Sequence, residues 1–187
     1  MHCETTIDPT GTWRDSYRAL EKLYQEGHIL SIGVSNFNRA LLDELTTFAT
    51  VMPHAVQNHG EIHRYDLDVR RWCKSHQVIY MPYATGRNLK SLPSSVIETL
   101  EKLSKSYNVS KNAISSQLFL QSGAVIIPRS TNPKHLEENM KLLSWELTSK
   151  DQSELGWNEG SISEEDQIFF SKIFESVVSE VEVDPKS

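Results

Sequence analysis

The 187-residue chain has little cysteine and no long apolar run. Its two cysteines, Cys3 and Cys73, are far apart, which argues against a zinc ribbon or a disulfide framework and fits a reducing compartment. No apolar stretch approaches the ~18 residues that cross a bilayer, and no basic patch followed by an apolar stretch marks a signal peptide at the N-terminus. We therefore expect a cytoplasmic protein that does not associate with membranes.

The chain also has no excess of positive charge. Nineteen Lys and Arg are outnumbered by 25 Asp and Glu, which gives a net charge of −6, so charge alone predicts no nucleic-acid partner. The segment 159–187 holds eight acidic and two basic residues and carries all of this charge, so residues 1–158 are neutral overall. Apolar residues within 163–181 recur at spacings of three and four, which predicts an amphipathic helix. We expect two parts: a folded body over 1–158 and an acidic helical tail over 159–187.

Within the body, short apolar runs alternate with stretches of helical periodicity. The predicted helices are 13–26, one that begins after Asn38 and is closed by Pro53, 66–76, 94–107, 110–121 and 133–142. The predicted strands are 29–34, 54–58, 78–81 and 124–127. This alternation indicates an α/β fold whose strands pair in parallel. Because an eight-stranded α/β barrel takes about 250 residues, the four strands form either an open sheet or roughly half of a barrel.

Polar residues follow the predicted strands, where α/β proteins place their chemistry. Ser35, Asn36 and Gln57 offer neutral donors and acceptors that suit a flat amide. Arg129 and Ser130 precede a predicted helix, whose N-terminus favours an anion such as phosphate. An amide site and a phosphate site together suggest a nicotinamide dinucleotide.

Two motifs carry a more specific resemblance. They are Ile32-Gly33-Val34-Ser35-Asn36-Phe37 and Ile127-Pro128-Arg129-Ser130 followed by Glu138-Asn139. Together with the helix over 13–27 and the pair Gln57-Asn58, they are similar to the C-terminal half of the aldo-keto reductase family, over about residues 12–156. The resemblance implies a partial TIM-type (β/α)8 barrel and, in intact relatives, NADPH-dependent reduction of aldehydes and ketones.

The resemblance also implies roles for individual residues. Ser35, Asn36 and Gln57 would hold the nicotinamide carboxamide of NADP(H). Arg129 and Ser130 would hold the adenosine 2′-phosphate, and Glu138 and Asn139 the adenine. The aromatic residue that stacks on the nicotinamide in many relatives falls near Met81. A family arginine at the 2′-phosphate aligns with His135, and a mostly neutral histidine weakens the expected preference for NADPH.

The family's catalytic tetrad is Asp, Tyr, Lys and His, and the first three come from the half of the barrel that this chain does not contain. The tetrad histidine ends the strand before the first helix seen here, where His2 stands. His2 is therefore the catalytic candidate, and an inert terminal histidine is the alternative. His59 and His63 around Glu61 do not have the HExxH spacing, so we expect no metal site.

Several functions remain open from the sequence. The first is a truncated oxidoreductase with a small carbonyl substrate, which needs a proton donor from outside this chain. The second is a catalytically inactive nucleotide-binding or regulatory module, and the third is a gene fragment without an independent role. Half a barrel has open edges, so we also expect self-association, or cover of the open side by the helix over 163–181.

Overall fold

The computed structural model describes residues 11–62 and 66–157. Three parallel strands form one sheet in the order β1 (Gly33–Ser35), β2 (Ala55–His59) and β3 (Ile79–Tyr83). Along the chain, α1 (Trp13–Gln25) precedes β1, α2 (Arg39–Thr46) lies between β1 and β2, and α3 (Leu67–Ser75) lies between β2 and β3. Thus β1-α2-β2 and β2-α3-β3 are two successive crossover units of a parallel α/β fold.

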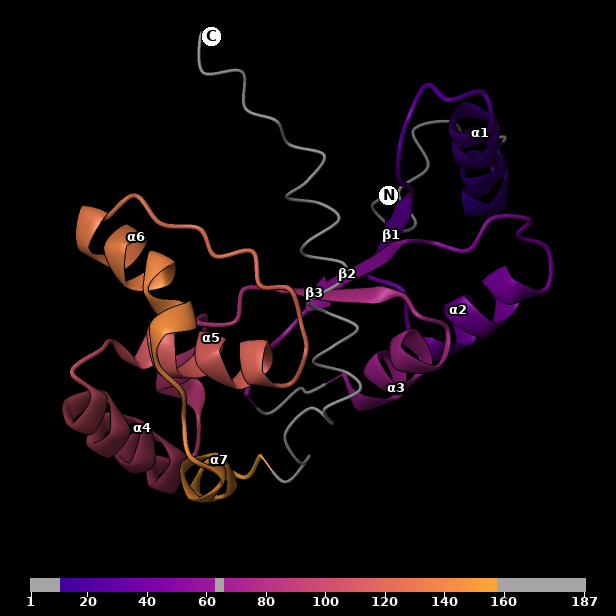
Figure 1. Ribbon diagram of the computed structural model, residues 1–187. Helices are drawn as coiled ribbons and strands as arrows, with labels where there is room; N and C mark the ends of the chain where they lie inside the picture. The colour runs from indigo at the N-terminus through magenta and orange to yellow at the C-terminus, as the bar shows by residue number, and fades with distance from the viewer. Residues whose placement is uncertain (1–10, 63–65, 158–187) are drawn as a thin grey trace, which may run out of the picture.

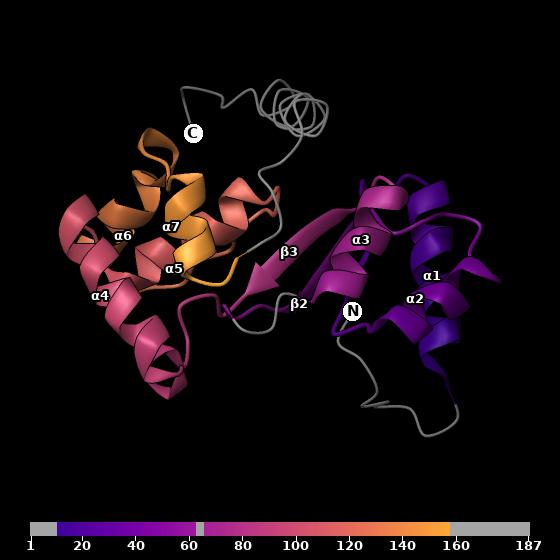
Figure 2. The same ribbon diagram turned by 90° about the horizontal axis from the view of Figure 1, so that it is seen from below.

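The second part of the chain is helical. It contains α4 (Ser94–Tyr107), α5 (Lys111–Gln121), α6 (Pro133–Met140) and α7 (Ser149–Glu154), with short 3-10 turns over Leu89–Ser91 and Leu142–Ser144. Figures 1 and 2 show α1–α3 gathered beside β1 and β2, and α4–α7 gathered on the other side of β3. Within the second group α5 is central, because a continuous run of its residues, 113–119, is buried.

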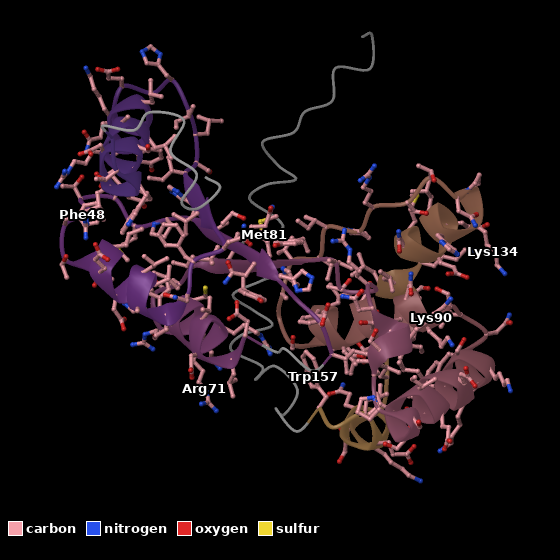
Figure 3. The ribbon with its side chains drawn as sticks, turned by 180° about the vertical axis from the view of Figure 1, so that it is seen from behind. Phe48, Arg71, Met81, Lys90, Lys134 and Trp157 are labelled. Atoms are coloured by element: carbon pink, nitrogen blue, oxygen red, sulfur yellow. The ribbon has the colours of Figure 1, made fainter. Side chains whose placement is uncertain are left out.

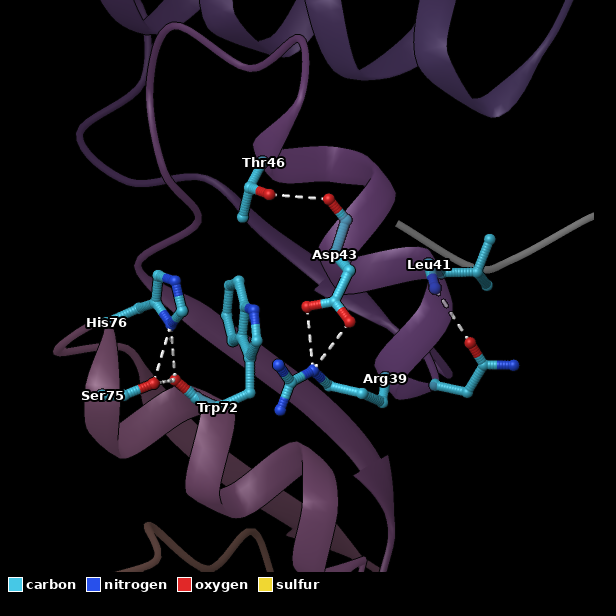
Figure 4. A network of polar contacts seen from close by, with 8 residues as sticks. Arg39, Leu41, Asp43, Thr46, Trp72, Ser75 and His76 are labelled. Carbon is cyan, nitrogen blue, oxygen red and sulfur yellow. Dashed lines mark hydrogen bonds and ion pairs between the residues drawn. The ribbon is translucent and has the colours of Figure 1, made fainter.

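Side-chain caps fix the starts of several helices. Thr12 and Asp15 form a reciprocal capping box at the start of α1, and Asn38 accepts the backbone N–H of Leu41 at 2.9 Å at the start of α2 (Figure 4). Ser110 caps α5 in the same way. Asn108 ends α4 in the left-handed region, with φ 53°, which asparagine tolerates better than most residues. The predicted helix over 94–107 is confirmed residue for residue.

One face of the sheet packs against the helices. Val34, Val56 and Tyr80 are paired in register across the three strands and are all buried. Below them, Trp72 and Cys73 of α3 belong to the same hydrophobic core. This packing anchors the strands, and the residues next to this row must face the other way because side chains alternate along a strand.

The last turn of α3 is closed by polar and aromatic contacts (Figure 4). The His76 ring stacks on Trp72 with a centroid separation of 4.2 Å and an interplanar angle of 17°. The Ser75 hydroxyl donates to the Trp72 carbonyl at 2.9 Å, and His76 Nδ1 lies 2.8 Å from the same oxygen. The same oxygen also accepts the His76 backbone N–H at 3.1 Å, so backbone and side-chain groups converge on one carbonyl at the end of the helix.

Gly33 allows β1 and β2 to pair closely. A Cβ atom on this residue would lie 2.8 Å from the Ala55 carbonyl oxygen, which is a backbone atom that cannot move aside. Any larger residue would therefore push apart the two strands that bring Ser35 beside Gln57.

The structure corrects several predicted boundaries. Residues 124–127 are not a strand: a single hydrogen bond, from Val125 N–H to the Tyr80 carbonyl at 2.9 Å, joins them to β3, and one bond does not make a ladder. The predicted strand over 29–34 shrinks to β1, because Leu30 is 83% exposed and its apolar character does not reflect burial. The second helix ends at Thr46, well before Pro53. Within residues 11–62 and 66–157, the sheet therefore has three strands, not four.

Some of the sequence predictions concern residues outside the described ranges. These residues are His2, His63 and the tail over 159–187 with its predicted helix. No helix among the described residues is long and apolar enough to span a membrane. Within the same residues, no cluster of three or more His, Cys, Asp or Glu side chains is arranged to hold a metal ion.

Candidate functional site

Three of the residues discussed above form one row across the sheet. Ser35 is paired with Gln57, and Gln57 with Met81, in the parallel register of β1, β2 and β3. The row lies on the face opposite Val34, Val56 and Tyr80, because neighbouring residues of a strand point to opposite faces. Figure 3 shows Met81 on the sheet between the two groups of helices. The fold thus brings together two of the predicted amide-binding residues, and it places Met81 beside them.

The hydroxyl of Ser35 has an unusual environment. The residue is only 4% exposed, and its Oγ atom has no hydrogen-bond partner among the described residues. Burial of an unpaired hydroxyl costs free energy that a folded protein normally avoids by hydrogen bonding.

Asn36 directly follows β1 and has a left-handed backbone conformation. Its φ is 61°, in the left-handed region, and its backbone N–H donates to the Gln57 carbonyl at 3.0 Å. The Asn36 side chain is exposed, and its Oδ1 accepts a hydrogen bond of 2.8 Å from the phenol of Tyr83 at the end of β3. Asn36 is therefore held next to Gln57 by its backbone and next to β3 by its side chain.

Asn58 holds the loop after β1 in place. Its Oδ1 accepts the backbone N–H of Phe37 at 3.1 Å, and its Nδ2 donates to the Phe37 carbonyl at 2.7 Å and to Asp66 Oδ2 at 2.6 Å. The Tyr80 phenol donates to the same Asp66 oxygen at 3.2 Å. Burial, and after it the nearby Asp66 carboxylate, raise the pKa of Tyr80 above its ordinary value, so this phenol remains a neutral donor.

An open cleft of about 410 Å³ lies at the carboxyl end of β1 and β2. The residues that line it are Asn36, Phe37, Asn38, Asn58, His59 and Asp66. Three of these six are asparagines, and the side-chain oxygens of all three already accept hydrogen bonds within the protein. A cleft at the carboxyl ends of parallel strands is the usual position of a ligand site in α/β proteins.

The predicted phosphate and adenine residues lie on and before α6. Arg129 is exposed, and the Ser130 hydroxyl accepts the Asn132 backbone N–H at 3.1 Å. Asn132 in turn caps α6 through the Lys134 N–H at 3.0 Å. Figure 3 shows Lys134 well separated from Met81, at the edge of the helical group, so the structure places these residues apart from the Ser35 row.

Glu138 lies near the end of α6 and, like Ser35, has a buried polar side-chain atom. Its Oε2 atom is buried and has no hydrogen-bond partner among the described residues. Five buried side-chain atoms have no hydrogen-bond partner among the described residues, although Glu44 Oε1 forms an ion pair with Arg14: Ser35 Oγ, Glu44 Oε1, Trp72 Nε1, Gln117 Oε1 and Glu138 Oε2. Two of the five belong to residues chosen from the sequence as ligand contacts, one in each group. Asn139 and His135 beside Glu138 are half-buried.

The sequence pattern does not mark Tyr83 as a site residue. It lies two positions after Met81, and nothing in the sequence pairs it with Asn36, 47 positions away. Asn58 belongs to the Gln57-Asn58 pair of the sequence, and its hydrogen bonds to Phe37 and Asp66 fix the loop after β1. The only available signal for both was their position at the end of a predicted strand.

Comparison with known proteins agrees with this architecture. Residues 2–156 match the family described as the aldo/keto reductase family. The chain belongs to this family. It is 33% identical over 154 residues to an uncharacterized oxidoreductase of Caenorhabditis elegans, a match that covers 80% of this chain and 46% of the relative. It is 32% identical over 150 residues to aldo-keto reductase family 1 member D1 of the rabbit Oryctolagus cuniculus, covering 75% of this chain and 46% of that protein.

A comparison with solved structures gives a matching fold. The crystal structure of a silkworm (Bombyx mori) aldo-keto reductase in complex with NADP superposes with a TM-score of 0.73 at 22% identity, covering 90% of this chain and 60% of that one. The three parallel strands and seven α-helices described here thus match part of the aldo-keto reductase barrel. The chain spans about half the length of the curated relatives it matches.

Proposed function

We propose that this aldo-keto reductase chain supplies the cofactor half of an active site, binding NADP(H) for the reduction of small aldehydes or ketones. The observation that carries the proposal is the row of Ser35, Gln57 and Met81, with Asn36 beside it, at the carboxyl ends of three parallel strands. The names of relatives support the same class, because one of the superposed structures is a complex with NADP.

In this proposal the nicotinamide carboxamide faces the Ser35 row. A carboxamide has one acceptor and two donor hydrogens, and Ser35, Asn36 and Gln57 together offer both kinds of partner. The unpaired and buried Ser35 Oγ fits this role, since the ligand would satisfy it. The left-handed backbone of Asn36 is consistent with it too, because strained residues gather at ligand sites.

The adenosine end faces α6. Arg129 is exposed and provides a planar cation for the 2′-phosphate, close to the start of a helix. The unpaired Glu138 Oε2 and the half-buried Asn139 would receive the amino group and ring nitrogens of adenine. His135 offers less charge to the phosphate than an arginine would, so we expect a moderate preference for NADPH over NADH.

Bound NADPH supplies a hydride, and the carbonyl that accepts it also needs a proton. The residues described here provide binding and orientation. The family's Tyr, Lys and Asp lie in the half of the relatives that this chain does not match, and His2 is the tetrad member that this chain would add. Turnover is therefore proposed for a site completed by such a segment.

A specific observation also favours self-association. The three-stranded sheet has two edge strands, β1 and β3, and each pairs with β2 alone among the described residues. Unpaired strand edges readily pair with another chain. A second candidate function is accordingly a nucleotide-binding module that associates with a further copy and does not turn over substrate.

The deciding experiment measures NADPH and NADH binding to the purified chain by calorimetry. We expect Arg129→Ala to weaken NADPH about tenfold or more and NADH by less than twofold, because only NADPH carries the 2′-phosphate. Lys105→Ala is the matched control, since Lys105 is an exposed cation on α4, away from α6. Equal losses for both cofactors would contradict the phosphate role, and no binding of either by the folded chain would refute the proposal.

A further inference from the structure

Tyr83 and Asn36 join the two edge strands of the sheet through their side chains. Tyr83 is the last residue of β3 and Asn36 follows the last residue of β1, so β2 lies between them. Neighbouring strands are about 4.8 Å apart, which places the two backbones roughly 10 Å from each other. The long phenol of Tyr83 spans this gap and donates to Asn36 Oδ1 at 2.8 Å. A short side chain at position 83 could not do so.

This hydrogen bond determines what Asn36 can offer. A carboxamide side chain presents an acceptor oxygen and a donor nitrogen, and a free asparagine on a surface can rotate to present either. Here the oxygen is engaged by Tyr83, and the backbone is held by the bond from Asn36 N–H to the Gln57 carbonyl at 3.0 Å. Asn36 lines the cleft, and with its oxygen engaged by Tyr83 the amide group that remains for a ligand is Nδ2, a donor.

The Tyr83 ring is itself held from the other side. His59, its partner in the register of β2 and β3, meets the ring edge-to-face at a centroid separation of 5.3 Å. His59 Nε2 lies 3.5 Å from Glu61 Oε1, and Asn88 Nδ2 donates to the same oxygen at 2.8 Å. Three successive contacts thus lead from the segment after β3 to the phenol that orients Asn36.

We infer that Tyr83 is a positioning residue that holds the Asn36 amide so that its N–H faces the ligand, making the site selective for a ligand with a carbonyl oxygen at this point. The inference rests on the proposed binding of NADP(H), whose carboxamide has such an oxygen. Tyr83 itself does not contact the ligand. It acts by removing one of the two orientations that Asn36 would otherwise sample.

The first test uses the chain without ligand. Side-chain ¹⁵N relaxation of the Asn36 amide, whose signal is identified by its loss in Asn36→Asp, is compared between the unmodified chain and Tyr83→Phe. We expect an ordered amide in the unmodified chain and a mobile one in Tyr83→Phe. The control is Tyr107→Phe, which removes a phenol-to-carboxylate hydrogen bond of 2.6 Å to Asp151 in the helical group. Equal mobility in the unmodified chain and Tyr83→Phe would overturn the inference.

The second test separates positioning from general support of the fold. NADPH is compared with adenosine 2′,5′-bisphosphate, a fragment that lacks the nicotinamide. We expect Tyr83→Phe to weaken NADPH about three- to tenfold, the range of one net hydrogen bond, and to leave the bisphosphate unchanged. A merely structural role would weaken both ligands equally and overturn the inference. If the unmodified chain bound neither ligand, the proposed function would fail, and the relaxation comparison would still decide whether Tyr83 holds Asn36.

Discussion

Replacing Ser35 by alanine should stabilise the chain and at the same time impair its cofactor site. The Ser35 hydroxyl is buried without a partner, and a buried unsatisfied polar group costs roughly 1–3 kcal/mol. Alanine removes that cost and loses only one small atom, so we expect the free energy of unfolding to rise by about 1 kcal/mol. For a chain of this size that corresponds to a melting temperature higher by roughly 2–4 °C. NADPH affinity should fall about five- to tenfold, because the bond to the ligand is lost.

The chain contains a matched control for this substitution. Ser116 is also 4% exposed, but its Oγ lies 3.1 Å from the hydroxyl of Thr85, so it has a partner. Ser116→Ala leaves Thr85 with an unsatisfied hydroxyl and should lower the free energy of unfolding by about 1–2 kcal/mol. The same change at two equally buried serines is therefore expected to have opposite signs.

The assay is urea denaturation of both variants, combined with calorimetric titration of NADPH. The free energy of unfolding is extrapolated linearly to zero urea. If its dependence on urea concentration is the same in both variants, the two differences in unfolding free energy can be compared directly. Destabilisation by Ser35→Ala equal to that of Ser116→Ala would refute the reasoning, since it would mean that the Ser35 hydroxyl is satisfied in the folded chain. Unchanged NADPH affinity in Ser35→Ala would remove this residue from the site.

Four further predictions concern the scaffold. Asn58→Ala breaks three hydrogen bonds to the loop after β1 and to the residue before α3, and should cost about 3 kcal/mol in urea denaturation. The Glu21 carboxylate accepts three bonds through a single oxygen, so Glu21→Ala should cost about 2–3 kcal/mol and Glu21→Gln, which keeps that oxygen, under ~1 kcal/mol; equal losses would contradict this. Burial raises the pKa of the Cys73 thiol to about 12, so in a variant that retains only this cysteine, Ellman's reagent should react slowly until the chain is unfolded. The Thr12 hydroxyl holds the pKa of Asp15 below its ordinary value of 3.8. The loss of unfolding free energy in Asp15→Ala should therefore be present at neutral pH and vanish as pH falls through that lowered pKa, and a loss independent of pH would refute this.

The local parts of the fold could be predicted because their signals are local. Thr12, Asn38 and Ser110 are side-chain caps that act within one turn, so their position in the sequence marks where a helix starts. The alternation of apolar runs with helical periodicity likewise identified a parallel α/β fold. The prediction of a strand over 124–127 was wrong because apolar composition does not distinguish a loop from a strand. Only backbone pairing does, and here a single bond from Val125 forms.

The chemistry of the site divides in the same way. The sequence by itself determined the family and the residue types at the strand ends, including Ser35, Asn36 and Gln57, because these follow short motifs. It could not show that Ser35 Oγ and Glu138 Oε2 are buried without partners, since burial depends on every element packed around an atom. Nor could it pair Tyr83 with Asn36, because that contact exists only when two crossover connections bring β1 and β3 to opposite sides of β2. Sequence patterns record interactions within a few residues, whereas contacts across a parallel sheet are set by the tertiary fold.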